Sequence, residues 1–307
     1  MKHYIDLHRD VTIEEMENLL TLAEDLKKKT KAGIPHPLLQ GKTLGMIFSK
    51  SSTRTRVSFE VGMYQLGGHA LFLSSNDIQL GRGESVYDTA NVLSRMVDAI
   101  MIRTFSHQDV EDLAKFGSVP IINGLTDEQH PTQALADLLT IKEQKGTLKG
   151  LKFAYLGDGN NVANSLIQAC AKVGMHIAVA SPKGYTCPDF YVEQGRKDAA
   201  VTGSTILMTE NPVEAVKDAD VVCTDTWTSM GQEEEKAIRT AIFKDYQVNN
   251  ELMSHAKKDA MFLHCLPAYR GYEVTEDVID SPRSFIFDEA ENRLHAHKAI
   301  LVHCLCS

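Results

Sequence analysis

Residues 51–56 (SSTRTR) bring hydroxyl and guanidinium groups together within one short segment. An apolar run at 43–48 precedes the segment and helical spacing follows it at 54–66, so we expect a loop between a buried strand and a helix. A helix N-terminus binds anions through its unpaired N–H groups and its dipole, and arginine adds bidentate contacts to phosphate or carboxylate. Because cations are disfavoured at a helix N-terminus unless an anion joins them, we favour an anion site over a serine cap beside two solvated arginines.

Further polar residues in the first half of the chain follow apolar runs. Arg103 comes at the end of the run at 99–102, and His130 and Gln133 flank Pro131, a residue favoured in the first turn of a helix. A guanidinium, an imidazole and an amide can each hydrogen-bond a carbonyl or a phosphate oxygen. Taken singly, Arg103 is equally compatible with a surface arginine, whereas a capping histidine and a solvated glutamine are the favoured interpretation of His130 and Gln133.

The second half of the chain repeats this arrangement. Asn160 and Asn161 stand in a loop at 157–161 after an apolar run, and Asp225 follows the run at 221–223. An aspartate at the end of a strand is a natural partner for a cationic group of a substrate, and the asparagines offer amides at a helix N-terminus. The glycines of this loop suggest dinucleotide binding, but the GxGxxG pattern fails at Val162.

His264 and Cys265 follow a third apolar run, at 261–263. A cysteine at a strand end can act as a nucleophile or in acid–base chemistry, or it can be a buried structural thiol. Because neighbouring residues of a strand point to opposite faces, we do not expect these two to form a Cys–His dyad. The C-terminal cluster of His303, Cys304 and Cys306 offers three ligands where zinc takes about four, so we expect no metal and no cofactor.

The elements that must position these residues alternate between apolar strands and amphipathic helices along nearly the whole chain. This alternation predicts the α/β class, with two doubly wound parallel-sheet domains whose ligands bind at the carboxyl ends of the strands. Gly146 and Gly150 mark a break. We therefore expect one domain at 1–146 and a second at 147–288, with a last strand at 285–287.

Composition excludes several classes of protein. The chain has 307 residues, and its 32 basic and 41 acidic side chains give a formal net charge of −9, which disfavours non-specific binding to nucleic acid. No window approaches the roughly 20 apolar residues of a membrane span, and the first residues lack the apolar core of a secretory signal. We therefore expect a cytoplasmic protein with no nucleic-acid or membrane partner. A local basic site can still bind a small anion.

Taken together and in this order, these segments resemble the aspartate/ornithine transcarbamylase family. The matching segments are 52–56 (STRTR), 130–133 (HPTQ), 225–231 (DTWTSMG) and 264–267 (HCLP). STRTR with HPTQ marks carbamoyl-phosphate binding, whereas SMG and HCLP mark the ornithine branch. The resemblance implies an active site in the cleft between the two domains, a C-terminal helix at 289–307 that returns to the first domain, and a homotrimer or a larger trimer-based assembly.

The resemblance also implies roles for individual residues. Arg103 would bridge the phosphate and the carbamoyl oxygen, Arg293 would stabilise that oxygen, and Gln79 would reach the active site of a neighbouring subunit. The implied catalytic residues are Arg103, His130, Asp225, Cys265 and Arg293. The implied carbamoyl-phosphate contacts are Ser52, Thr53, Arg54, Thr55, Gln79, Arg103, His130, Gln133, Cys265, Leu266 and Arg293. The implied ornithine contacts are Asn161, Asp225, Ser229 and Met230.

The implied reaction moves the carbamoyl group of carbamoyl phosphate to the δ-amino group of L-ornithine, giving L-citrulline and phosphate in arginine metabolism. Alternatives are a transcarbamylase for another amine, such as putrescine or an acylated ornithine, a non-catalytic anion-binding protein on the same scaffold, and a dinucleotide-dependent dehydrogenase. The SMG segment argues against the first alternative. The intact Arg54, Arg103, His130 and Cys265 argue against the second, and the broken glycine pattern argues against the third.

Overall fold

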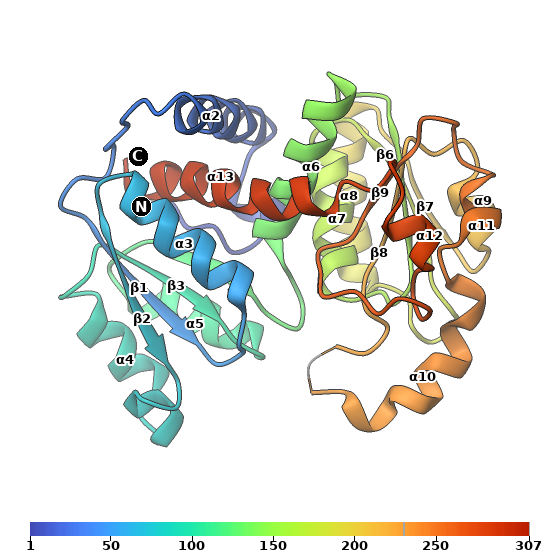
Figure 1. Cartoon of the computed structure of the whole chain (residues 1–307). Helices are drawn as coiled ribbons and strands as arrows, with labels where there is room; N and C mark the ends of the chain where they lie inside the picture. Colours follow the sequence, from blue (N-terminus) through green and yellow to red (C-terminus); the bar gives the residue numbers. More distant parts are fainter. Residues whose placement is uncertain (230, 307) are drawn as a thin grey trace. The chain divides into compact units, whose positions relative to one another are not determined.

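The computed structural model describes residues 1–229 and 231–306. The chain forms two compact units, one of Met1–Leu139 together with the chain from Glu291 onward, and one of Thr140–Ala290. Each unit contains a sheet with helices packed on its faces (Figure 1). Two helices, α6 (Pro131–Lys145) and α13 (Ile286–Leu305), begin in one unit and end in the other.

The sheet of the first unit has the strand order β2-β1-β3-β4, and every pairing in it is parallel. The central strands β1 and β3 are almost fully buried, as expected when helices cover both faces of a parallel sheet, whereas the edge strand β2 is partly exposed. The strands are β1 (Thr43–Phe48), β2 (His69–Ser74), β3 (Ala99–Arg103) and β4 (Ile121–Leu125).

Local sequence signals explain where the helices of this unit begin. Thr12 opens α2 (Ile13–Lys31) with a capping box, in which the Thr12 hydroxyl accepts from the Glu15 N–H at 3.1 Å and the Glu15 carboxylate accepts from the Thr12 N–H at 2.9 Å. Ser85 begins α4 with a simpler cap, in which its hydroxyl accepts from the Asp88 N–H at 3.0 Å. The other helical elements are α1 (Leu7–Asp10), α3 (Thr53–Gln65), η1 (Gln79–Arg82), α4 (Val86–Leu93) and α5 (His107–Phe116).

The sheet of the second unit has the strand order β7-β6-β5-β8-β9, again with parallel pairings. Its strands are β5 (Lys152–Leu156), β6 (His176–Ala180), β7 (Ile206–Thr209), β8 (Val221–Thr224) and β9 (Met261–Leu263). Its helices are α7 (Asn161–Lys172), α8 (Asp189–Thr202), α9 (Pro212–Val216), α10 (Lys236–Phe243), α11 (Asn250–Met253) and α12 (Glu276–Ile279), with the 3-10 turns η2 (Glu233–Glu235) and η3 (Lys244–Tyr246). Over the described part of the chain, no helix has both the length and the apolarity needed to cross a membrane.

Each sheet has a point where the connections from adjacent strands lead to opposite sides. In the first unit the chain passes from β1 to β2 on one side, while β3 pairs with the other side of β1. In the second unit it passes from β5 to β6 on one side, while β8 pairs with the other side of β5. Ligands of doubly wound sheets bind outside the carboxyl ends of the strands at such switch points. The loops after β1 and β3, and after β5 and β8, are therefore the expected binding loops.

The prediction of two doubly wound parallel sheets is confirmed. The predicted strand at 285–287 is wrong, because Ser284 makes only a single bridge with Phe262 and α13 already begins at Ile286. Asp288 and Glu289 stand in the first turn of α13, where carboxylates interact favourably with the helix dipole, and this favours a helix at these positions.

Candidate active site

The loop after β1 opens a helix, as predicted. The Ser52 hydroxyl accepts from the backbone N–H of Thr55 at 3.2 Å and donates to the Thr55 hydroxyl at 3.1 Å, so Ser52 is the N-cap of α3. The carbonyl of Arg103, at the end of β3, accepts from the Ser49 N–H at 2.8 Å and holds this loop at the switch point. Thr53 is exposed and Arg54 is partly exposed, so both remain accessible to an anion at the helix N-terminus.

Arg293 joins three helices of the first unit through its buried guanidinium. One terminal nitrogen donates to the Gln133 side-chain oxygen at 2.6 Å on α6, and the other donates to the Thr55 hydroxyl at 2.9 Å on α3. Gln133 in turn donates to the Asp137 carboxylate at 2.7 Å, which fixes the orientation of its amide. Three of the predicted site residues, far apart in sequence, thus form one hydrogen-bonded cluster.

His130 is a buried histidine in a positively charged environment. Burial, followed by the charges of Arg293, Arg103, His297 and Arg54, holds the pKa of His130 well below its ordinary value of 6.5. The imidazole is therefore neutral at physiological pH and serves as a hydrogen-bonding group rather than as a source of charge. The same arginines give this half-site a positive field that favours an anionic ligand.

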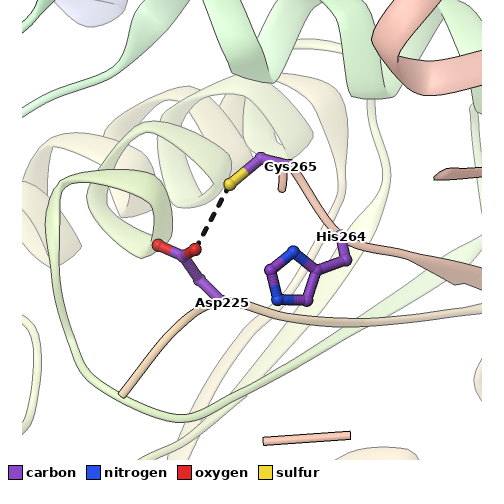
Figure 2. Close-up of side chains that lie close together, drawn as sticks. All are labelled: Asp225, His264 and Cys265. Atoms are coloured by element: carbon purple, nitrogen blue, oxygen red, sulfur yellow. Dashed lines mark hydrogen bonds between the residues drawn. The ribbon is translucent and has the colours of Figure 1, made fainter. Parts of the chain in front are cut away.

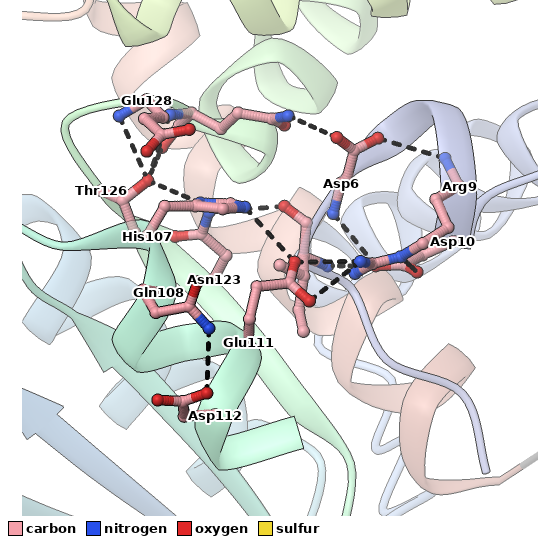
Figure 3. Close-up of polar contacts among 12 residues, drawn as sticks. Asp6, Arg9, Asp10, His107, Gln108, Glu111, Asp112, Asn123, Thr126 and Glu128 are labelled. Atoms are coloured by element: carbon pink, nitrogen blue, oxygen red, sulfur yellow. Dashed lines mark hydrogen bonds and ion pairs between the residues drawn. The ribbon is translucent and has the colours of Figure 1, made fainter. Parts of the chain in front are cut away.

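The N-terminal segment anchors the loop that leads to His130 (Figure 3). The Gln129 side chain donates to the buried Asp6 carboxylate at 2.6 Å, and the Thr126 N–H donates to the Gln129 carbonyl at 2.9 Å. Arg9, on α1, pairs with Glu111 of α5 at 2.9 Å. These contacts tie α1, α5 and the loop after β4 together and limit the movement of the backbone that carries His130.

In the second unit, Asp225 and Cys265 meet just beyond the neighbouring strands β8 and β9. The Cys265 thiol donates to the Asp225 carboxylate over a distance of 3.3 Å (Figure 2). The Asn160 amide donates to the other Asp225 oxygen, Oδ2, at 2.9 Å, and the Thr226 N–H donates to the same oxygen as the thiol, Oδ1, at 2.8 Å. These donors are neutral, so they orient the Asp225 carboxylate without neutralising its charge. The pair is suited to holding and orienting an amino group.

His264 lies beside this pair but uses both ring nitrogens elsewhere. Its Nδ1 accepts from the Leu266 N–H at 2.9 Å, and its Nε2 lies 3.2 Å from the Glu273 carboxylate. The expectation that His264 and Cys265 do not form a dyad is confirmed. Asp225, His264 and Cys265 have donor atoms within 4.8 Å of one another, the spacing of a metal site. Because the His264 nitrogens are engaged, this set fits a metal ion poorly.

The loop after Asp225 is held by Arg239 of α10. The buried guanidinium donates to the Asp158 carboxylate at 2.7 Å and to the Trp227 carbonyl at 3.1 Å, and also to Glu235 at 2.8 Å. Burial raises the pKa of Asp158, and the ion pair with Arg239 opposes this rise. Arg239 thus ties the loop after β5 to the loop after β8. An arginine within an amphipathic helix gives no sequence signal for this role.

The remaining predicted site residues occupy separate positions. Gln79 is exposed on η1, after the edge strand β2. Leu266 follows Cys265 with a φ of 58°, an uncommon conformation for a residue other than glycine. Ser229 donates its N–H to the Gln232 side chain at 3.1 Å, and Met230 lies outside the described residues.

Asn161 is the first residue of α7, and the contact to Asp225 comes from its neighbour Asn160. The predicted site contained Asn161 but omitted Asn160. The sequence indicated both asparagines as amides at a helix N-terminus, but only the residue type of Asn160, a strong N-cap before a helix, distinguishes the two.

Comparison with known proteins assigns a ligand class to each half of the chain. Residues 2–143 match the carbamoyl-P binding domain of aspartate/ornithine carbamoyltransferase, and residues 149–304 match its Asp/Orn binding domain. The chain belongs to the aspartate/ornithine carbamoyltransferase family.

Similar proteins within this family include several ornithine carbamoyltransferases. An ornithine carbamoyltransferase from Caldicellulosiruptor saccharolyticus is 59% identical over 302 residues, covering 98% of both chains. One from Anoxybacillus flavithermus is 62% identical over 296 residues, covering 96% of this chain and 94% of the relative. The solved structure of ornithine carbamoyltransferase from Pyrococcus furiosus superimposes with a TM-score of 0.96 at 56% identity, covering 100% of this chain and 97% of that one.

Proposed function

We propose that this protein transfers the carbamoyl group of carbamoyl phosphate to the δ-amino group of L-ornithine, giving L-citrulline and phosphate in arginine metabolism. One observation carries the proposal. The chain matches the carbamoyl-P and Asp/Orn binding domains, and its first structural unit has an arginine-rich half-site around Arg293, while its second unit has an oriented Asp225–Cys265 pair. The expectation that the reaction takes place between the two domains remains a prediction.

The first half-site supplies what the carbamoyl donor requires. Ser52, Thr53, Arg54 and Thr55, at the N-terminus of α3, bind the phosphate through hydroxyl groups, backbone N–H groups and a guanidinium. As the amine attacks, the carbamoyl oxygen gains negative charge, and Arg103, Arg293 and the neutral His130 are the donors that stabilise it. His130 and Gln133 orient the carbamoyl group. Arg54 then stabilises the phosphate as it leaves.

The second half-site acts on the amine. A Lys-like amino group has an unperturbed pKa of about 10.4, so it must release one proton to water before it can attack the carbamoyl carbon; its second proton passes to the departing phosphate as the C–N bond forms and the C–O bond breaks. Asp225 and Cys265 accept hydrogen bonds from this amino group and orient its lone pair, while Cys265 and Leu266 also contact the carbamoyl donor. Asn161, Ser229 and Met230 bind the α-amino-acid end of ornithine. The chemistry calls for positioning of two substrates, with no covalent enzyme intermediate.

We also propose a homotrimer or a larger trimer-based assembly in the cytoplasm. The first unit exposes apolar side chains on and beside the edge strand β2, including Leu71, Phe72, Val57 and Tyr64. Exposed apolar groups of this kind mark protein–protein contact surfaces. Gln79 lies exposed just after this strand, where a neighbouring subunit could receive it. A reducing compartment suits the exposed thiol of Cys306.

The decisive experiment is a citrulline assay with ornithine, putrescine and aspartate tested side by side against carbamoyl phosphate. We expect ornithine to give the highest kcat/KM by a wide margin. A preference for putrescine would replace the ornithine assignment with that of another transcarbamylase. Binding of carbamoyl phosphate without turnover of any amine would support a non-catalytic binding protein instead.

A further inference from the structure

His297 lies one turn after Arg293 on α13 and has no role in the mechanism described above. Its side chain is fully buried, and its ring stacks on Phe59 of α3 with 3.9 Å between the ring centroids and 18° between the planes. Its Nε2 lies 3.3 Å from the Arg293 Nε, and its Nδ1 lies 2.8 Å from the Ser58 hydroxyl. Both ring nitrogens are therefore committed to named partners.

The partners on either side of His297 fix its tautomer independently. The Ser58 hydroxyl donates its proton to the Arg54 carbonyl at 2.6 Å, so towards the imidazole it can only accept, and Nδ1 must carry a proton. The Arg293 Nε–H can only donate, so Nε2 must be unprotonated. Both constraints give the same neutral ring. A protonated ring would place two donors and two positive charges against each other at Arg293.

The electrostatic environment agrees with this assignment. Burial, followed by the charge of Arg293, holds the pKa of His297 well below its ordinary value. The basic groups that interact with it electrostatically are Arg293 on its own helix and His130 at the start of α6. Each of them favours a neutral His297.

The contacts form a continuous hydrogen-bonded path. It runs from the Arg293 Nε–H to His297, from His297 to Ser58, and from Ser58 to the carbonyl of Arg54. The two terminal nitrogens of Arg293 bond to Gln133 and Thr55, so His297 adds a third acceptor in a third direction. The path links the guanidinium to the backbone of the phosphate-binding turn.

We propose that His297 is a positioning residue, which holds the Arg293 guanidinium in place for the carbamoyl oxygen through a neutral imidazole protonated on Nδ1. The proposal rests on the function proposed above, because it assigns Arg293 its role there. A histidine that only filled the core beside Phe59 would need the ring but not its nitrogens. The two explanations therefore predict different activities for a variant in which the ring is kept but its nitrogens are removed.

The test compares His297→Phe, which keeps a ring on Phe59, with His297→Gln, whose amide oxygen can accept from Arg293 and whose amide N–H can donate to Ser58. We expect the phenylalanine variant to lose about tenfold in kcat, with a smaller change in the KM for ornithine, because the lost contact acts on the transition state. The glutamine variant should recover most of this loss. His295→Phe is the matched control, since His295 is a buried histidine on the same helix that contacts Glu291 instead of Arg293; it should keep the wild-type kcat.

Nitrogen-15 NMR of the wild-type imidazole provides a readout that needs no turnover. We expect the resonances of a neutral ring protonated on Nδ1 and a shifted Arg293 Nε–H resonance that moves in His297→Phe. An Nε2-protonated ring, or a wild-type kcat in His297→Phe, would overturn the proposal. Absence of citrulline formation by the wild-type protein would instead contradict the proposed function. The NMR result would then still show whether His297 has the proposed tautomer and bonds to Arg293.

Discussion

The Asn160 side chain donates a hydrogen bond of 2.9 Å to the Asp225 carboxylate, although 65 residues separate them in the sequence. The Oδ1 of the same amide accepts from the N–H groups of Val162 and Ala163 and caps α7. One asparagine therefore begins a helix and orients a carboxylate on the neighbouring strand end. The contact is made where β5 and β8 lie side by side at the switch point of the second sheet.

Replacing Asn160 with aspartate should impair ornithine use while preserving the helix. Aspartate caps a helix as well as asparagine does, but it has no N–H to donate to Asp225 and would place a second negative charge beside it. We expect the KM for ornithine to rise by at least about tenfold, since a hydrogen bond to a charged group contributes about 1.5–3 kcal/mol and about 1.4 kcal/mol corresponds to tenfold. The KM for carbamoyl phosphate should be unchanged. Steady-state kinetics with each substrate varied in turn measures both.

Asn211→Asp is the control for this substitution. Asn211 caps α9 through the same bonds, to the N–H groups of Val213 and Glu214, and lies in an exposed cap. Its kinetics should match the wild-type protein. An unchanged KM for ornithine in Asn160→Asp would show that the Asn160–Asp225 contact has no part in substrate binding.

The sequence indicates where the candidate site residues lie in the fold better than it indicates their contacts. Arg54, Arg103, Asp225 and Cys265 were found because each follows an apolar run, and parallel strands carry such residues to one edge of a sheet. The contact of Arg293 with Thr55 could not be predicted from the sequence, because a helical pattern does not indicate which distant helix the Arg293 side chain will contact. Physically, a strand end is a local feature, whereas a side-chain pairing depends on how whole elements pack.

The same distinction explains the strand predicted wrongly at 285–287. Two phenylalanines around an isoleucine read as a buried strand, and short apolar runs do not distinguish strands from helix starts. The pairing of Phe262 with Ser284 satisfies only one bridge, after which α13 begins. The sequence does not indicate the buried contacts of Arg239 for the opposite reason, because a charged residue on an amphipathic helix is usually solvated.

Arg54→Ala should weaken binding of carbamoyl phosphate. Arg54 stands in the first turn of α3, whose N–H groups and dipole favour an anion, and its guanidinium adds charge-assisted hydrogen bonds worth about 1.5–3 kcal/mol each. We expect at least about tenfold weaker affinity by isothermal titration calorimetry. Arg56→Ala is a suitable control, because the Arg56 guanidinium bonds to Glu60 and stacks on Phe72. Equal affinities in wild type and Arg54→Ala would remove Arg54 from the phosphate site.

Arg239→Met should destabilise the second unit and loosen the loop after β8. The substitution leaves the largely buried Asp158 carboxylate without its cation and the Trp227 carbonyl without its donor. Breaking a buried ion pair from one side costs roughly 3 kcal/mol. We expect a lower free energy of unfolding and a higher KM for ornithine.

A double variant separates the charge effect from the loop effect. In Arg239→Met with Asp158→Asn, the unpaired charge is gone, so most of the stability should return while the KM for ornithine stays high. Urea denaturation and steady-state kinetics of the single and double variants measure the coupling between Arg239 and Asp158 in stability and in ornithine use. Full recovery of both quantities would mean that Arg239 acts only through Asp158 and does not hold the loop.

The buried histidines should make the protein less stable as the pH falls below about 6.5. Burial lowers the pKa of His295 to about 4, and the pKa values of His130 and His297 are also lowered. Between the folded pKa and the unfolded value of about 6.5, the unfolded chain binds more protons than the folded one, so the free energy of unfolding rises with pH across this window. For a pKa of about 4, moving from pH 6.5 to pH 5 removes up to ~2 kcal/mol per histidine.

The wild-type slope alone does not isolate this effect, because carboxylates with a lowered pKa, such as Glu15 at about 2, are also destabilising on acidification. The informative quantity is the difference in the pH dependence of the free energy of unfolding between wild type and His295→Phe. This variant removes one buried histidine and keeps the carboxylates. We expect the variant to lose up to ~2 kcal/mol less than wild type between pH 6.5 and pH 5. Urea denaturation at one fixed protein concentration measures this, since association would shift the midpoint with concentration. Parallel pH dependences for the two proteins would mean that His295 titrates normally in the folded state.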